Sequence, residues 1–331
     1  MSDSSNTGSH DAVFRRMLGE PANAASQLRA VLPVALVKRL DLDRLAPAPG
    51  SFVDATLRWR HSDLLFRVPL DGRASFVYVL VEHQSRTDPV MAFRMLHYVV
   101  RIWDHYLQEH PGASRLPAVI PVVVHHNRRP WSSPTEVLDL VDLDHDTAVA
   151  VRPHLPRFQF LLDDLAAVDE QALRARPVNP PVRMTLLLLK IAAGNPRLAD
   201  ELRRWADELT AVREGPGGED HFLTLLTYIG RVGEAPAAEL HKLFAELGPD
   251  AEEAYVTTAE MLRAEGEARG EARGEARGEA RGRAAALAQI LTLKFGPLPQ
   301  ATLDAVHGAT KDQLETWTAR VLTATTLQDV L

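Results

Sequence analysis

The chain has 331 residues, of which 46% are hydrophobic and 24% are charged, as is ordinary for a globular protein. It contains no cysteine, which excludes disulfides and thiolate metal sites, so any metal must be held by carboxylate, imidazole or carbonyl groups. A hard cation such as Mg²⁺ fits this supply of ligands. The polar N-terminus and the short apolar runs predict a cytoplasmic protein with no membrane-spanning segment.

The net charge of -7 is unevenly distributed along the chain. Residues 1–135 hold 16 Lys and Arg against 12 Asp and Glu, together with eight of the 13 histidines, whereas the remainder holds 21 basic against 32 acidic residues. Because the local field guides a polyanion into a cleft, this asymmetry is compatible with nucleic-acid binding by the first part of the chain.

The first part of the chain alternates helical and strand-like segments after a polar stretch, residues 1–9, that is expected to be disordered. The expected elements are helices at 10–18 and 22–40, strands at 52–59, 63–69 and 75–82, a helix at 89–105, and strands at 118–124 and 157–162. The order α-β-β-β-α-β implies a mixed sheet, with its third and fourth strands parallel and joined by a right-handed helical crossover. We therefore predict an α/β domain over residues 10–165, with a mixed four-stranded sheet flanked by helices.

From residue 166 onward the pattern is helical. A helical region is expected over 166–262, a Gly-Glu-Ala-Arg repeat tract over 263–283 and a small helical C-terminal domain over 284–331. The helices expected in the first of these lie at 181–193, 197–212, 220–232 and 235–247.

The repeat tract places a glycine at every fourth residue from Gly266 onward. Each glycine costs about 1 kcal/mol relative to alanine in a helix, and no Glu stands three or four residues before an Arg within the repeat itself, residues 266–281, which predicts a poor autonomous helix. The small residues would nevertheless form a seam that admits a partner helix. The tract is therefore either a homo-oligomerisation element or a solvated spacer.

The segment with the clearest chemistry is a hairpin with acidic residues near its far ends. Asp63 opens one apolar run, Asp71-Gly72-Arg73 supplies the turn, and Glu82 closes the second run. If the turn closes on Gly72-Arg73, Asp63 faces Glu82 at roughly 5 Å between Cβ atoms; if it closes on Asp71-Gly72, Asp63 faces Leu80 and the two carboxylates are diagonal, roughly 7 Å apart. Either spacing lets both carboxylates hold one divalent ion.

The residues that follow Glu82 add further polar groups. The backbone carbonyl of His83 is a possible third oxygen ligand, and Gln84 shares a strand face with Glu82, which places its amide beside the metal. Metal-dependent phosphodiester hydrolysis needs these groups together with an activated water and positive charge near the phosphate. The alternative is that the strand has simply ended in a polar loop.

Several segments in the same order resemble a known family. The motifs HDAVFRRML, SFVDATLRWRHSDLLFRV, YVLVEHQS followed by Asp88-Pro89, FRMLHYVVRIWDHYL and RRPW are similar to the Rpn family of recombination-promoting nucleases, also called YhgA-like putative transposases. The resemblance is close over about residues 10–140. The tail from about Ile290, with FGPLP, QLETW and TLQDVL, resembles the C-terminal domain that often accompanies this family, and Gly-Glu-Ala repeats between the two parts are typical of it.

This resemblance implies the fold and the site of the PD-(D/E)XK nuclease superfamily, whose restriction-endonuclease-like core agrees with the element order above. By position, Asp63 would be the motif aspartate, Glu82 the (D/E) residue, and Gln84 the residue that is usually lysine. Because glutamine offers only amide hydrogen bonds, the missing positive charge must come from elsewhere, and Arg94 on the following helix is the candidate.

Other polar residues allow two interpretations. Asp11 either approaches the metal from the first helix or stabilises the start of that helix. The adjacent His125 and His126 point oppositely on a strand, so they are not expected to chelate one ion. Trp59 and Trp131 are expected to pack rather than to stack on bases.

These observations predict a Mg²⁺-dependent DNA endonuclease, with Mn²⁺ as a possible substitute, linked to recombination or mobile elements. Asp63, Glu82 and the His83 carbonyl would hold the metal, while Gln84 and Arg94 would assist catalysis. The alternatives are a DNA-binding or assembly protein that keeps the nuclease fold without catalysis, favoured by Gln84, and an RNA-cleaving nuclease, since no feature reads the 2′-hydroxyl.

Overall fold

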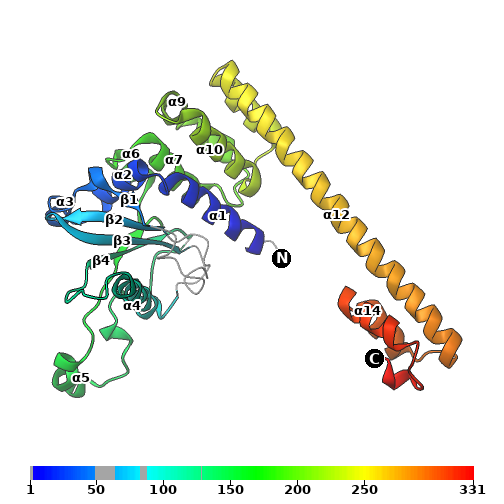
Figure 1. Cartoon of the computed structure of the whole chain (residues 1–331). Coiled ribbons are helices and arrows are strands. Elements are labelled where there is room, and N and C mark those ends of the chain that lie inside the picture. The colour runs from blue at the N-terminus through cyan, green and yellow to red at the C-terminus, as the bar shows by residue number, and fades with distance from the viewer. Residues whose placement is uncertain (1–2, 49–63, 83–87, 128) are drawn as a thin grey trace. The chain divides into compact units, whose positions relative to one another are not determined.

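The computed structural model describes residues 3–48, 64–82, 88–127 and 129–331 (Figure 1). The chain divides into two compact units, Met1–Ala259 and Glu260–Leu331, and the first contains the sheet. The hydrophobic core of the first unit is continuous from the sheet into the helices that follow it in sequence. The domain boundaries expected from the sequence inside this unit stay predictions.

The sheet has five strands in the spatial order β1-β2-β3-β4-β5. They are β1 (Ala46–Pro47), β2 (Leu64–Leu70), β3 (Arg73–Glu82), β4 (Ala118–His125) and β5 (Leu161–Asp164). β1, β2 and β3 pair antiparallel, whereas β3, β4 and β5 pair parallel. The predicted mixed α/β sheet and its parallel crossover are therefore confirmed, with five strands where four were expected. The strand expected at 52–59 lies outside the described residues.

The turn between β2 and β3 closes on Asp71-Gly72. Both residues have positive φ, 49° and 76°, as a type I′ hairpin turn requires, and Leu70 pairs with Arg73 across it. This is the second of the two turn positions considered above, from which the sequence predicts diagonal carboxylates.

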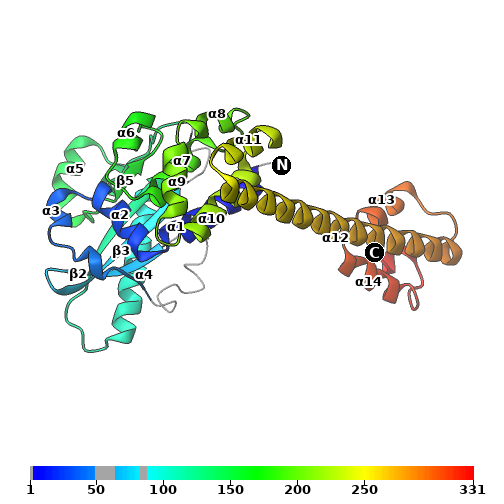
Figure 2. The same ribbon diagram turned by 90° about the horizontal axis from the view of Figure 1, so that it is seen from above.

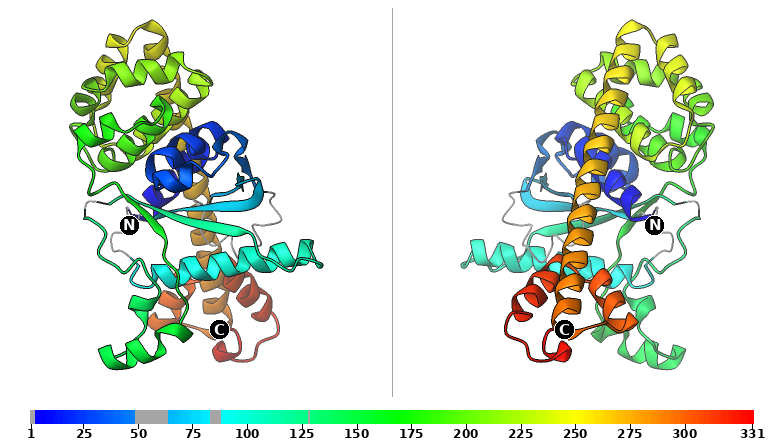
Figure 3. Two further views of the ribbon diagram at one scale, coloured as in Figure 1. Left: turned by 90° about the vertical axis from the view of Figure 1, so that its left-hand side faces the viewer. Right: turned by 90° about the vertical axis from the view of Figure 1, so that its right-hand side faces the viewer.

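Helices cover both faces of the sheet (Figure 3). On one face α4 (Met91–Glu109), which connects β3 to β4, packs Met91 and Met95 against Phe76 and Val123. The other face is covered by α1 (Asp3–Leu18), α2 (Pro21–Val31) and α7 (Pro180–Ile191). There Phe14 of α1 belongs to a second hydrophobic cluster together with Val77 of β3 and Val124 of β4. α1 begins at Asp3, earlier than the sequence pattern predicts.

The remaining elements of the first unit are α-helices and 3₁₀ turns. The α-helices are α3 (Val34–Val37), α5 (His145–Val151), α6 (Glu170–Ala175), α8 (Leu198–Arg203), α9 (Ala206–Glu214), α10 (Gly218–Val232) and α11 (Ala237–Glu246). The 3₁₀ turns are η1 (Leu42–Arg44), η3 (Leu138–Leu140) and η4 (Arg152–His154). The single helix expected at 197–212 is two helices, separated at the fully buried Trp205. Within the described part of the chain, no helix is long and apolar enough to cross a bilayer.

The second unit is built on the end of the long helix α12 (Pro249–Phe295), with α13 (Gln300–Gly308), α14 (Lys311–Arg320) and the turn η5 (Leu327–Asp329) (Figure 2). Leu287 and Leu291 of α12 form a small core with Val306 and Leu314. The repeat tract is helical throughout, although the sequence predicts a poor helix. Its Ala, Glu and Arg residues are strong helix formers, and the helix continues through the tract from helical segments on either side.

Candidate functional site

The three parallel strands of the sheet end side by side with polar residues. Glu82, the last residue of β3, is in register with His125, the last residue of β4, and His125 is in register with Asp164, the last residue of β5. The carboxyl ends of parallel strands form the edge at which α/β proteins bind their ligands. We define these three residues and their neighbours as the polar edge.

Most of the residues predicted for the metal site lie beyond what the structure describes. Asp63, His83 and Gln84 are outside the described residues, and of Glu82 only the backbone is described. The described part of the chain contains no group of three or more His, Asp or Glu side chains placed to hold a metal. The assignment of Asp63, Glu82, His83 and Gln84 stays a prediction, with Glu82 at the polar edge.

Asp164 organises the loop that follows β4. Its Oδ2 accepts a hydrogen bond of 2.8 Å from the backbone N–H of Trp131, and its Oδ1 accepts one of 3.1 Å from that of Ala166. The Trp131 ring packs edge-on against His125 and Phe160, at centroid distances of 5.2 and 5.8 Å. The expected packing role of Trp131 is confirmed, and both Asp164 oxygens are already engaged by the protein.

Asp163 points to the opposite face and forms a buried ion pair. Arg176 donates two hydrogen bonds of 2.8 Å to its two oxygens, and Gln27 of α2 donates a third of 2.6 Å. The side chains of Asp163 and Arg176 are only 5% and 13% exposed. This clamp ties the end of β5 to α2 and to the segment after α6.

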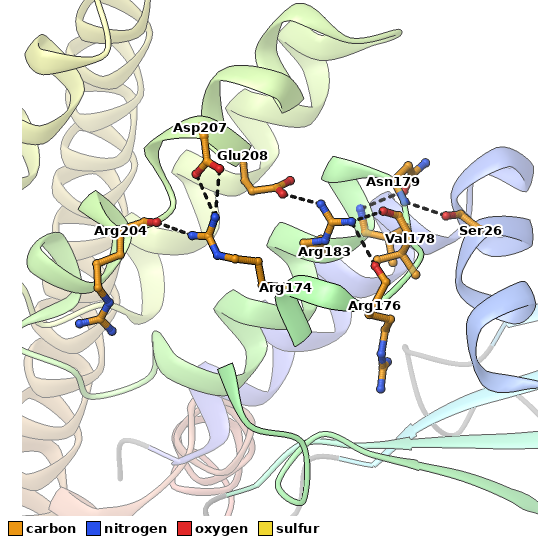
Figure 4. A network of polar contacts seen from close by, with 10 residues as sticks. Ser26, Arg174, Arg176, Val178, Asn179, Arg183, Arg204, Asp207 and Glu208 are labelled. Carbon is orange, nitrogen blue, oxygen red and sulfur yellow. Dashed lines mark hydrogen bonds and ion pairs between the residues drawn. The ribbon is translucent and has the colours of Figure 1, made fainter. Parts of the chain in front are cut away.

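The segment between α6 and α7, which contains Arg176, also forms polar contacts with the surrounding helices (Figure 4). Arg183 of α7 pairs with Glu208 of α9 and donates to the backbone carbonyls of Arg176 and Val178, at 3.1 and 2.7 Å. Asn179, the N-cap of α7, donates from its backbone to the Ser26 hydroxyl at 2.8 Å. These hydrogen bonds and the ion pair tie the segment between α6 and α7 to α2 and α9.

A buried imidazole cluster joins the polar edge to α1 and α10. His10 of α1 shares a 2.7 Å hydrogen bond with the hydroxyl of Tyr228, and its ring meets that of His126 edge-on at 4.9 Å. Burial raises the pKa of the Tyr228 phenol, so it stays protonated at physiological pH. Asp11 is also buried, at 5% exposed.

The adjacent histidines at the end of β4 lie in different surroundings: His125 is the last residue of the strand, and His126 follows it. His125 bonds the Arg129 carbonyl at 3.1 Å beside Trp131, whereas His126 packs against His10. The two imidazoles therefore have different neighbours, as expected for adjacent residues whose side chains point in opposite directions.

Arg94 lies in the first turn of α4, the helix that follows β3 in the described part of the chain. Its guanidinium forms an ion pair of 2.5 Å with Asp88, and the two side chains are 20% and 15% exposed. Burial alone lowers the pKa of Arg94, but the hydrogen bonds with Asp88 and Tyr98 raise it above its usual value. Arg94 therefore stays charged, and its charge faces a carboxylate.

Sequence reasoning missed several of these polar contacts. Asp163 and Asp164 end the apolar run of β5 as Glu82 ends that of β3, and that pattern was the available signal. The contact of His10 with Tyr228 spans 218 residues, and no local pattern announces it.

The family model described as "Putative transposase, YhgA-like" matches residues 8–218, which include the whole sheet, the helices α2, α4 and α7 that flank it, and most of α1. The chain belongs to this family. The predicted resemblance to the Rpn and YhgA-like proteins is thereby confirmed.

Proteins named as recombination-promoting nucleases are similar to this family member. It is 40% identical over 126 residues to RpnD of Escherichia coli O157:H7, a match that covers 37% of this chain and only 48% of RpnD. It is 27% identical over 271 residues to RpnA of Escherichia coli K12, covering 81% and 87% of the two chains. A protein of the same strain named as inactive, RpnE, is 27% identical over 268 residues, covering 80% and 85%. No solved structure matches the chain.

Proposed function

We propose that this protein is a Mg²⁺-dependent DNA endonuclease that acts in recombination or in mobile elements. The observation that carries the proposal is the placement of Glu82 at the end of a central parallel strand, beside His125, in a chain whose relatives are named as nucleases. The chain has no thiolate, so the available donors at this edge are oxygen and imidazole groups, and oxygen groups suit Mg²⁺.

In this proposal Asp63, Glu82 and the His83 carbonyl hold the metal. A bound Mg²⁺ would supply Lewis-acid activation of the attacking water and neutralise charge on the phosphate. Gln84 orients that water through its side-chain amide, which accepts and donates hydrogen bonds but does not titrate.

Arg94 would contribute the positive charge that lysine usually brings. Its guanidinium must first exchange Asp88 for the substrate phosphate, because the 2.5 Å ion pair now neutralises it. Replacing Asp88 by asparagine frees the charge while retaining an amide of similar shape. Under the proposal, Asp88→Asn raises the cleavage rate and Arg94→Ala lowers it, whereas equal loss in both variants assigns the pair a structural role only.

The test of the central proposal is a cleavage assay. Purified protein with Mg²⁺ is expected to nick or degrade plasmid DNA, and Asp63→Ala and Glu82→Ala are each expected to abolish the activity. Asp142→Ala, which removes an exposed carboxylate elsewhere in the first unit, is the matched control and is expected to leave cleavage intact. Activity that survives both site substitutions refutes the assignment.

A second candidate function is a DNA-binding or assembly protein that keeps the nuclease fold without catalysis. Two related proteins are named as inactive, one of them matched over 80% of this chain, and Gln84 replaces the usual lysine. DNA binding without cleavage in Mg²⁺ or Mn²⁺, unaffected by Asp63→Ala, supports this function. Paired DNA and RNA substrates in the same assay distinguish the third candidate, an RNA-cleaving nuclease.

The repeat tract is proposed as a homo-oligomerisation element. In α12, a Cβ added at Gly266, Gly270, Gly274, Gly278 or Gly282 meets no atom within 4 Å, so this seam is uncovered in the single chain. Sedimentation of the full chain, compared with a variant in which these glycines are leucines, tests whether the seam packs against a second copy.

A further inference from the structure

A basic pocket opens at the end of the sheet opposite the polar edge. It has a volume of about 760 Å³ and lies between the β2–β3 turn, the end of α4 and the loop that enters β4, with Arg39, Asp71, Arg73, Tyr106 and Arg115 among its lining residues. Arg73 begins β3 and Glu82 ends it, so the ten residues of the strand separate the two sites by about 30 Å. The pocket is therefore a location distinct from the candidate metal site.

The charges in this pocket are not balanced. Arg39 donates to the Asp71 carboxylate at 2.7 and 2.8 Å. The side chains of Arg73 and Arg115 are exposed, and neither guanidinium has a hydrogen-bond or ion-pair partner among the described residues. Three guanidinium groups against one carboxylate leave two uncompensated positive charges in one concavity.

The backbone that carries these arginines is fixed before any ligand binds. Arg73 is held beside the type I′ turn by its pairing with Leu70. The loop with Arg115 is fastened to α4, because the Trp103 indole donates to the Pro117 carbonyl at 2.9 Å and the His110 ring stacks on Tyr106 at 4.2 Å and 19°. A fixed backbone lowers the entropy lost when a ligand binds.

We propose that this pocket binds phosphate groups of a nucleic-acid backbone, at a stretch remote from the candidate metal site; the choice of a nucleic acid as ligand rests on the proposed function. Guanidinium forks match the oxygen geometry of phosphate and keep their charge at any physiological pH. The open, solvent-exposed arrangement of Arg73 and Arg115 suits a continuous strand that passes across the protein, and the excess of basic residues in 1–135 adds to the attraction.

The test is a binding assay that needs no catalysis. Binding of a fluorescein-labelled 30-bp DNA duplex to the full chain is measured by anisotropy in EDTA, between 50 and 200 mM salt, for the unaltered protein and for Arg73→Ala/Arg115→Ala. Loss of two phosphate contacts is expected to reduce the slope of log K against log salt by about 1.8 and to raise the Kd about tenfold or more at 100 mM salt. Circular dichroism should give the same Tm for both, since neither arginine has a described partner.

The control double variant, Arg152→Ala/Arg157→Ala, removes two exposed arginines elsewhere in the first unit and has the same net charge. Equal weakening by this control overturns the proposal, because the effect would then belong to total charge. Calorimetry with inorganic pyrophosphate distinguishes a nucleic-acid backbone from a small phosphate compound as the ligand. If Arg73→Ala/Arg115→Ala abolishes the heat of pyrophosphate binding but leaves duplex binding unchanged, the pocket binds a small phosphate compound and the proposal is overturned. If the double variant Arg73→Ala/Arg115→Ala binds both the duplex and pyrophosphate as the unaltered protein does, the pocket is not a phosphate site.

Discussion

The buried ion pair between Asp163 and Arg176 gives the sharpest test of how the polar edge is supported. Replacing Asp163 by alanine leaves the Arg176 guanidinium, 13% exposed, without its two charge-assisted hydrogen bonds and removes the acceptor of Gln27. Breaking a buried pair by removing one partner costs about 3–5 kcal/mol, because an uncompensated charge stays buried. For a unit of this size, that loss corresponds to a fall in Tm of roughly 6–20 °C.

The matched control is Asp207→Ala. Asp207 of α9 pairs with Arg174 of α6, but the Asp207 side chain is 67% exposed, so this substitution is expected to cost less than about 1 kcal/mol. The assay is thermal unfolding of the full chain followed by circular dichroism. The double variant Asp163→Ala/Arg176→Ala should lose less than the sum of the single variants, by about 0.5–3 kcal/mol, because no lone charge is left behind. An Asp163→Ala protein as stable as Asp207→Ala refutes the reasoning.

Three further predictions concern backbone conformation and pH. Gly72→Ala should destabilise the protein by about 1–2 kcal/mol in chemical denaturation, because φ is +76° at that position. The control Gly112→Ala, at an open site without positive φ, should change the free energy of unfolding by less than about 0.5 kcal/mol. Equal effects of the two substitutions would contradict the turn assignment. Gly270→Ala/Gly274→Ala should stabilise α12 by about 1 kcal/mol per substitution, seen as slower proteolysis within the tract, and faster proteolysis would show that the glycines themselves are required. Burial raises the pKa of Glu170, but hydrogen bonds from Arg204 and Trp205 outweigh burial and lower the pKa. The Glu170 carboxylate therefore stabilises the fold above about pH 4.3, and this contribution is lost as the pH falls through the lowered pKa. Glu170→Gln should reduce Tm at pH 7 and match the unaltered protein in acid, and a difference in Tm that does not change with pH would exclude this titration.

The strands and the crossover were predictable because their signals are local. β2, β3 and β4 are mainly apolar runs, β3 and β4 are rich in valine, and the Asp71-Gly72 dipeptide between β2 and β3 is a strong hairpin signal. Two turn positions remained open from the sequence, since both keep the alternation of apolar residues, and only the observed φ values and register decide between them. The break at Trp205 was missed because helical periodicity continues on both sides of it.

The contacts that support the polar edge were not predictable in the same way. Gln27 reaches Asp163 across 136 residues and His10 reaches Tyr228 across 218, so each partner depends on how the helical region packs against the sheet. The neutralisation of Arg94 by Asp88 was likewise hidden, although the two are only six residues apart, because a helical pattern does not reveal which way a side chain bends at the first turn. Helical amphipathicity identifies a buried face but not the polar partners within it.

The central claim is that the carboxylates at the hairpin ends make this family member a metal-dependent nuclease. The most direct measurement is cleavage of supercoiled plasmid by the purified full chain with and without Mg²⁺, beside Glu82→Ala and the exposed-carboxylate control Asp142→Ala. The account predicts Mg²⁺-dependent nicking that Glu82→Ala abolishes and Asp142→Ala retains. Cleavage that persists in Glu82→Ala, or an unaltered protein that binds DNA but leaves it intact in both Mg²⁺ and Mn²⁺, would contradict it.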